Sequence, residues 1–171
     1  MTHETAQAVN GLGDGKSNDW HTPKRIFDAL GCQFDLDVSA PANGPLHTPC
    51  AHWLSELSLE TQWMGFVWMN PPFGGRNGLE PWLDKFFAHG DGIALTPDRT
   101  SAPWFHQAWA RADCVLFTRG KTPFLLSCGS KAGSPAFGTA LWASGERAVE
   151  ALRHAQRKGF GALSFTQSVA A

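Results

Sequence analysis

The sequence predicts an α/β fold, in which helices flank an open, mostly parallel sheet. Apolar stretches of strand length alternate with stretches of helical spacing along the second half of the chain, as in repeated strand–helix–strand units. In the first half, residues 64–70 (MGFVWMN) form a continuous apolar run, which is typical of a parallel strand covered on both faces. The 171 residues, of which 43% are hydrophobic and 17% charged, suffice for one domain with its own core.

The first expected elements are a short helix over 22–31 and a strand over 33–40. Thr22 can cap the helix, Pro23 suits its first position and Gly31 can end it. The strand follows from the alternation of apolar and polar residues in QFDLDVSA.

In the later part of the chain, segments with helical spacing of apolar residues alternate with short apolar runs of strand length. Helices are expected over 79–89, 101–112 and 146–159, and strands over 92–97, 113–120 and 137–144. In a sheet of this kind, ligands bind beyond the carboxyl ends of the strands.

Composition, cysteine spacing and net charge indicate the extent of the domain, its compartment and how it could bind nucleic acid. Residues 1–17 are polar and glycine-rich and are interpreted as a flexible leader, followed by a single domain over 18–171. The four cysteines show no CxxC spacing, and no signal peptide or membrane-spanning run is visible, so we expect a cytoplasmic protein with reduced thiols. The net charge of −1 means that any nucleic acid must be held by a local basic patch.

The sequence Asn70-Pro71-Pro72-Phe73 follows the apolar run directly. Prolines stiffen such a loop, so the Asn70 side-chain oxygen and the Pro71 carbonyl oxygen can point at one spot and accept both hydrogens of an amino group. Phe73 offers a flat face for a planar ring. The loop therefore suits the methylation of an exocyclic amine, although a plain proline turn after a strand would look the same.

Further segments give this loop a context. Residues 19–30 (DWHTPKRIFDAL), 34–40 (FDLDVSA), 95–106 (LTPDRTSAPWFH) and 115–124 (VLFTRGKTPF) surround it in a fixed order. Together with NPPF they resemble the bacteriophage-type DNA N6-adenine methyltransferase family, over roughly residues 19–143. The resemblance implies a Rossmann-like methyltransferase fold, S-adenosylmethionine as the cofactor, and double-stranded DNA as the substrate, with the target adenine flipped out of the helix.

The resemblance also implies roles for individual residues. The catalytic residues would be Asn70, Pro71, Pro72 and Phe73. The cofactor would be bound by Trp20, Thr22, Pro23, Asp35, Asp37 and Asn43. DNA would be bound by Arg76, Arg99, Thr100, Trp104, His106, Arg119 and Lys121.

Besides Phe73, which stands where tyrosine is commoner in the family, the chain departs from the family pattern in two places. The glycine-rich fingerprint after the first strand is missing, and the usual G-R-x-x-F turn reads RGKTPF over 119–124. Asp37 is favoured over Asp35 as the residue that accepts hydrogen bonds from the cofactor's amino group, and Asp35 could be structural. Glu56 and Glu60 lie where a ribose-binding acid is usual, but they also suit a solvated surface.

Two further clusters have competing interpretations. His47, Cys50 and His52 are close in sequence but lack a fourth ligand, so no metal is expected. Arg76, Arg99, Arg119, Lys121 and Lys131 follow expected strands and would form a basic rim around Asn70, or else are scattered solubilising charges.

Two other functions remain open from the sequence. A methyltransferase of the same fold could act on RNA adenine or protein glutamine, and a catalytically silent protein could bind DNA or counter restriction. No separate recognition domain fits this length, so target specificity would come from loops, chiefly 74–80 and 119–135.

Overall fold

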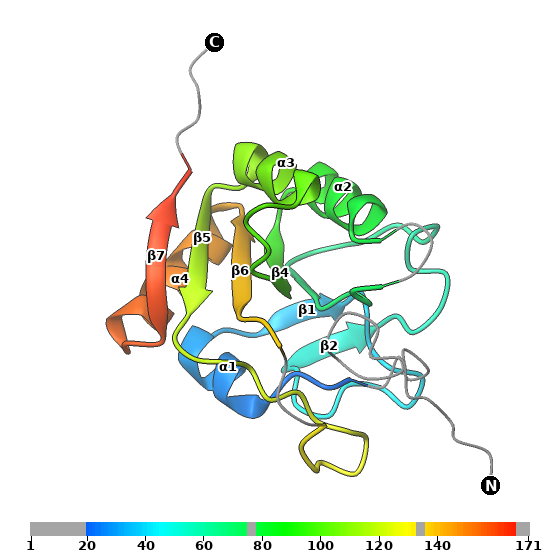
Figure 1. The fold of residues 1–171 in the computed structure, drawn as a ribbon. Coiled ribbons are helices and arrows are strands. Elements are labelled where there is room, and N and C mark those ends of the chain that lie inside the picture. The colour runs from blue at the N-terminus through cyan, green and yellow to red at the C-terminus, as the bar shows by residue number, and fades with distance from the viewer. Residues whose placement is uncertain (1–19, 75–77, 133–135, 167–171) are drawn as a thin grey trace, which may run out of the picture.

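The computed structural model describes residues 20–74, 78–132 and 136–166 (Figure 1). The expected leader, residues 1–17, and Arg76 lie outside these ranges. The strands are β1 (Phe34–Asp37), β2 (Cys50–Trp53), β3 (Val67–Met69), β4 (Gly92–Pro97), β5 (Cys114–Thr118), β6 (Thr139–Ser144) and β7 (Gly161–Phe165). The helices are α1 (Lys24–Leu30), α2 (Glu80–His89), α3 (Pro103–Arg111) and α4 (Glu146–Arg157). None of the described helices is long and apolar enough to cross a membrane.

The seven strands form one mixed sheet in the order β2-β1-β3-β4-β6-β5-β7. The pairs β1–β2, β1–β3 and β3–β4 are parallel, whereas β4–β6, β5–β6 and β5–β7 are antiparallel. The α/β class is confirmed, but the prediction of a mostly parallel sheet was wrong. The difference arises at β6 and β7: β6 runs antiparallel to both β4 and β5, and β7 runs antiparallel to β5, so the sheet is parallel only over β2-β1-β3-β4.

Helices cover both faces of the sheet, with α1 and α4 on one side and α2 and α3 on the other (Figure 1). Consecutive strand residues enter opposite cores: Trp68 packs in the α1–α4 core, while Val67 and Met69 pack in the α2–α3 core. This explains why β3 and β4 read as continuous apolar runs, since every side chain of a strand covered on both faces is buried.

The structure differs from the expected elements at two sheet edges and at one helix end. β2 and β7 were not predicted, because most residues of each are exposed or half-buried and give no continuous apolar run. α1 begins at Lys24 with Pro23 as its N-cap, and the described residues supply no side-chain hydrogen bond at that end, so the expected Thr22 cap is wrong. Gly31 ends the helix as expected, with φ of 65°.

A lysine fixes the connection between β2 and β3. The Lys85 Nζ of α2 donates hydrogen bonds to the carbonyl oxygens of Ser58 (3.0 Å), Leu59 (2.7 Å) and Thr61 (2.5 Å). The Ser58 hydroxyl donates in turn to the carbonyl oxygen of Val38, directly after β1. α2 therefore supports the backbone at the carboxyl end of β1.

We expect Lys85→Met to lower the free energy of unfolding by about 1–3 kcal/mol, because three carbonyl groups lose a charged donor. Lys24→Met is the matched control: Lys24 pairs with Asp28 on an exposed helix face, and such pairs contribute about 1 kcal/mol or less. Urea unfolding of both variants measures the difference. Equal losses would show that the Lys85 bonds do not stabilise the fold.

Candidate active site

The site lies where the order of the parallel strands reverses. β1 and β3 are neighbours, but the chain leaves β1 toward β2 on one side and leaves β3 toward β4 on the other. At such a switch point the connections diverge and leave a crevice beyond the carboxyl ends of the strands. Asp37 is the last residue of β1, and Asn70 directly follows β3.

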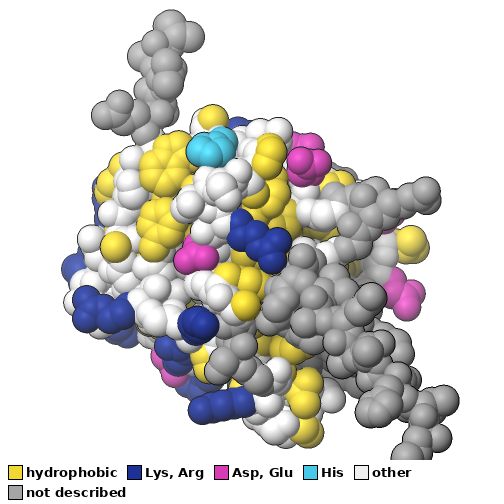
Figure 2. Space-filling view, viewed as in Figure 1, with side chains coloured by type: hydrophobic (Ala, Val, Ile, Leu, Met, Phe, Trp, Pro, Cys, Tyr) yellow, Lys and Arg dark blue, Asp and Glu magenta, His cyan; other side chains and the backbone are white. Residues whose placement is uncertain are grey.

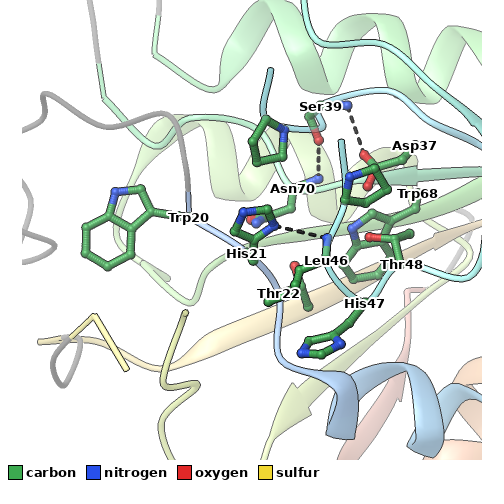
Figure 3. Close-up of a pocket in the computed structure, with 12 residues that line it drawn as sticks. Trp20, His21, Thr22, Asp37, Ser39, Leu46, His47, Thr48, Trp68 and Asn70 are labelled. Atoms are coloured by element: carbon green, nitrogen blue, oxygen red, sulfur yellow. Dashed lines mark hydrogen bonds between the residues drawn. The ribbon is translucent and has the colours of Figure 1, made fainter. Parts of the chain in front are cut away.

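One hydrogen bond joins the two strand ends at this crevice. The Asn70 backbone N–H donates to the Ser39 Oγ over 2.7 Å, and the Ser39 N–H donates to the Asp37 carboxylate over 3.1 Å (Figure 3). A pocket opens beside them. Its lining consists of Trp20, His21, Thr22, Asp37, Ser39, Pro41, Pro45, Leu46, His47, Thr48, Trp68 and Asn70.

Asp37 is the buried charge of the pocket, with a relative exposure of 3%. Burial raises the pKa of its carboxyl to about 6, while hydrogen bonds from the Ser39 N–H and the Thr48 side chain act in the opposite direction. None of the described lining residues is a lysine or an arginine. The pocket can therefore stabilise a cationic group, which would compensate the carboxylate that burial disfavours.

Three separate segments of the chain meet at His21, which belongs to the pocket lining. Its backbone pairs with Leu125, with N–H to O distances of 2.8 and 3.0 Å in the two directions. Its Nδ1 accepts a hydrogen bond from the Leu46 N–H over 3.2 Å. The residue thus links the chain before α1 to the β1–β2 connection and to the β5–β6 connection. Figure 3 shows it between Trp20 and Asp37, which lie toward opposite ends of the lining.

The NPPF loop leaves β3 beside this pocket. Pro71 is buried, Pro72 is exposed, and Phe73 is half-buried against both cores. The Phe73 ring meets two other rings edge to face, Phe124 at 5.9 Å and Phe137 at 6.2 Å between centroids. Packing therefore sets the orientation of Phe73.

The structure brings three of the six expected cofactor residues to the pocket, namely Trp20, Thr22 and Asp37. Pro23 is buried at the start of α1 but is not part of the lining. Asn43 is exposed in the turn over residues 41–44, outside the lining.

Asp35 lies apart from the pocket. Its carboxylate accepts a hydrogen bond from the Phe66 N–H over 2.7 Å and lies 3.8 Å from Arg147 of α4. Asp37 is buried in the pocket lining, whereas the Asp35 side chain is 59% exposed. These contacts favour the structural interpretation of Asp35.

The expected DNA-binding residues are mostly on the surface. Arg99, Thr100, His106, Arg119 and Lys121 are exposed, whereas Trp104 is half-buried against the α2–α3 core. The face drawn in Figure 2 carries Lys and Arg side chains with apolar and acidic side chains between them, rather than one continuous basic band. Arg76 and part of the 74–80 loop fall outside the described residues.

Three polar residues of the pocket wall received no role from the sequence. His21 and Ser39 lie in segments that carry the family resemblance, whereas Thr48 belongs to no recognisable motif. The one available signal was the cluster of prolines and polar residues over 39–49, which marks a loop directly after a strand. Within the described ranges, no group of three or more His, Cys, Asp or Glu residues could hold a metal ion.

Comparison with known proteins places the chain in a family. A family model described as DNA N-6-adenine-methyltransferase (Dam) matches residues 12–141, about three quarters of the sequence. The chain belongs to this family. It is an enzyme that methylates the N6 amino group of adenine in DNA, and the family implies S-adenosylmethionine as the methyl donor. No curated protein and no solved structure matches the chain.

The raised pKa of Asp37 makes the stability of this methyltransferase depend on pH. Its folded-state pKa of about 6 exceeds the ordinary value of 3.8, so the native state binds the proton more tightly than the unfolded chain. The part of the unfolding free energy that comes from this tighter proton binding is fully present below pH 4. It is lost as the pH rises through 6, and the total loss is about 3 kcal/mol. We expect the unfolding free energy of Asp37→Asn, relative to wild type, to rise by up to this amount between pH 4 and 7.

Urea unfolding at several pH values tests this expectation, because all other titrating groups are common to the two proteins and their contributions cancel. A difference between the two proteins that stays constant from pH 4 to 7 would contradict the burial of an ionisable carboxyl at this position.

Proposed function

We propose that this methyltransferase binds S-adenosylmethionine in the switch-point pocket and presents adenine from double-stranded DNA to Asn70. The observation that best supports this proposal is the direct link between the ends of β1 and β3, in which the Asn70 N–H donates a hydrogen bond to the Ser39 hydroxyl beside Asp37. In this proposal the strands β2-β1-β3-β4 form the Rossmann-like half of the domain. Doubly wound folds with this strand order bind their ligands at the switch point between β1 and β3.

The residues of the pocket fit this cofactor. When bound, S-adenosylmethionine supplies a methyl group from a positively charged sulfonium centre. Asp37 accepts hydrogen bonds from the cofactor's amino group and balances its positive charge, and the described residues give Asp37 no salt bridge of its own. Thr22 adds a hydroxyl to the buried wall, and Trp20 adds an aromatic surface at the far end of the lining.

Asn70 and the loop after it hold the target base. The Asn70 side-chain oxygen and the Pro71 carbonyl oxygen accept the two hydrogens of the adenine amino group, which directs the nitrogen lone pair toward the methyl donor. Phe73 stacks on the flipped base. Because the proton can leave after transfer, positioning and electrostatics provide most of the rate enhancement.

Duplex binding relies on positive charge around the loop rather than on the net charge. The side chains of Arg99, Arg119 and Lys121 are exposed and would bind phosphate oxygens of the duplex. Moving one base out of the stack costs a few kcal/mol, which these contacts and the base pocket must offset. In this proposal, specificity for the target sequence comes from surface loops near the pocket.

We expect Asn70→Ala to retain binding of S-adenosylmethionine, because Asp37 and the rest of the lining are unchanged, and to lose methyl transfer by at least about a hundredfold, because one acceptor for the target amine is removed. Asn43→Ala is the matched control. Its side chain is exposed in a turn outside the pocket, so both binding and transfer stay at the wild-type level. Tritium transfer to unmethylated DNA measures the rate, and calorimetry measures cofactor affinity.

The same assay with RNA and with protein as acceptors separates the proposed substrate from the alternatives. Labelling of N6 of adenine in duplex DNA, well above the other acceptors, supports the proposal. Equal transfer by Asn70→Ala and wild type would show that the loop does not orient the amine.

We expect cofactor binding to weaken below about pH 6, by up to tenfold per pH unit, because protonated Asp37 cannot balance the cofactor's charge. Asp37→Asn should bind weakly and without this dependence. Asp35→Asn, which changes an exposed carboxylate beside Arg147, keeps both the affinity and the pH profile of wild type. A wild-type affinity that is constant from pH 5 to 8 would contradict the role of Asp37.

A further inference from the structure

Four aromatic rings form a continuous row beside the pocket. Trp20 meets Phe124 at 6.5 Å between centroids, Phe124 meets Phe73 at 5.9 Å, and Phe73 meets Phe137 at 6.2 Å. All three contacts are edge to face, with interplanar angles of 89°, 71° and 69°. The row thus connects a lining residue of the cofactor pocket with the ring of the NPPF loop.

Phe124 is the fixed centre of this row. Its exposure is 1%, and it belongs to the α1–α4 core although it lies in the β5–β6 connection. The backbone around it is held on both sides, because Leu125 pairs with His21 and the Ala132 N–H donates to the Phe124 carbonyl oxygen over 2.9 Å. A ring held in this way cannot shift without displacing Trp20 or Phe73.

The other end of the row reaches the expected DNA-binding segment. The Arg99 guanidinium lies over the Phe137 ring, 5.3 Å from its centroid. The two segments are also joined through their backbones, since the Asp98 N–H donates to the Gly138 carbonyl oxygen over 3.1 Å. Any phosphate that draws Arg99 into a new position acts on Phe137 and, through it, on Phe73.

From this geometry we propose that Phe124 and Phe137 are positioning residues that couple cofactor binding to DNA binding, so that each ligand tightens the other. The inference rests on the proposed function, in which Trp20 borders the cofactor and Phe73 stacks on the base. A ligand at either end selects one arrangement of the packed rings, and the other ligand then binds a site that is already ordered.

The experiment measures the affinity of S-adenosylhomocysteine, the unreactive product of the cofactor, with and without saturating unmethylated duplex DNA. For wild type we expect DNA to tighten this affinity by about fivefold or more. Phe124→Leu and Phe137→Leu remove a ring but keep apolar volume, and in both the enhancement falls to less than about twofold. Phe86→Leu is the matched control: Phe86 is equally buried in the α2–α3 core and packs on Phe87, so its variant keeps the wild-type enhancement.

Because Phe137 is only half-buried, Phe137→Leu should fold even if Phe124→Leu does not, and the coupling can then be measured on Phe137→Leu alone. The proposal is overturned if wild type shows no enhancement, or if Phe137→Leu retains it in full. A failure of the underlying function looks different, because Asp37→Asn would then bind S-adenosylhomocysteine as well as wild type does.

Discussion

The hydrogen bond from the Asn70 backbone N–H to the Ser39 hydroxyl is the constraint on which the site depends. It joins the carboxyl ends of β1 and β3, the two strands between which the sheet order reverses. Through Ser39 it also fixes the backbone beside Asp37, whose carboxylate accepts the Ser39 N–H. The group that would orient the target amine and the group that would hold the cofactor are therefore set by one short segment of backbone, without a glycine-rich loop.

The rest of the fold supports that junction from outside. Lys85 and Ser58 fix the backbone after β1, and His21 ties the chain before α1 to the connections that follow β1 and β5. The connection over 38–49 joins two parallel strands without a helix, which frees its residues to line the pocket. The pocket is therefore lined mostly by residues of connections rather than of helices or strands.

Sequence patterns predicted the elements whose side chains face a core and missed those that do not. β3 and β4 were recognisable because both of their faces are buried, whereas β2 and β7 lie at the sheet edges and lack an apolar run. Strand direction was predicted wrongly for the C-terminal half, although α2, α3 and α4 each still join two strands that run the same way. Within the site, Asp37 and Asn70 were found from short motifs. Ser39, His21 and Phe124 depend on contacts between distant segments, and no local pattern encodes such contacts.

We propose that the cofactor lies between Asp37 and Asn70 at the switch point. The most direct measurement is a crystal structure of the protein with S-adenosylhomocysteine. We expect the amino group of the ligand at the Asp37 carboxylate, its sulfur on the side of Asn70, and Trp20 and Thr22 in contact with it. A ligand bound elsewhere, or one that touches the pocket without approaching Asp37, would contradict this placement of the cofactor.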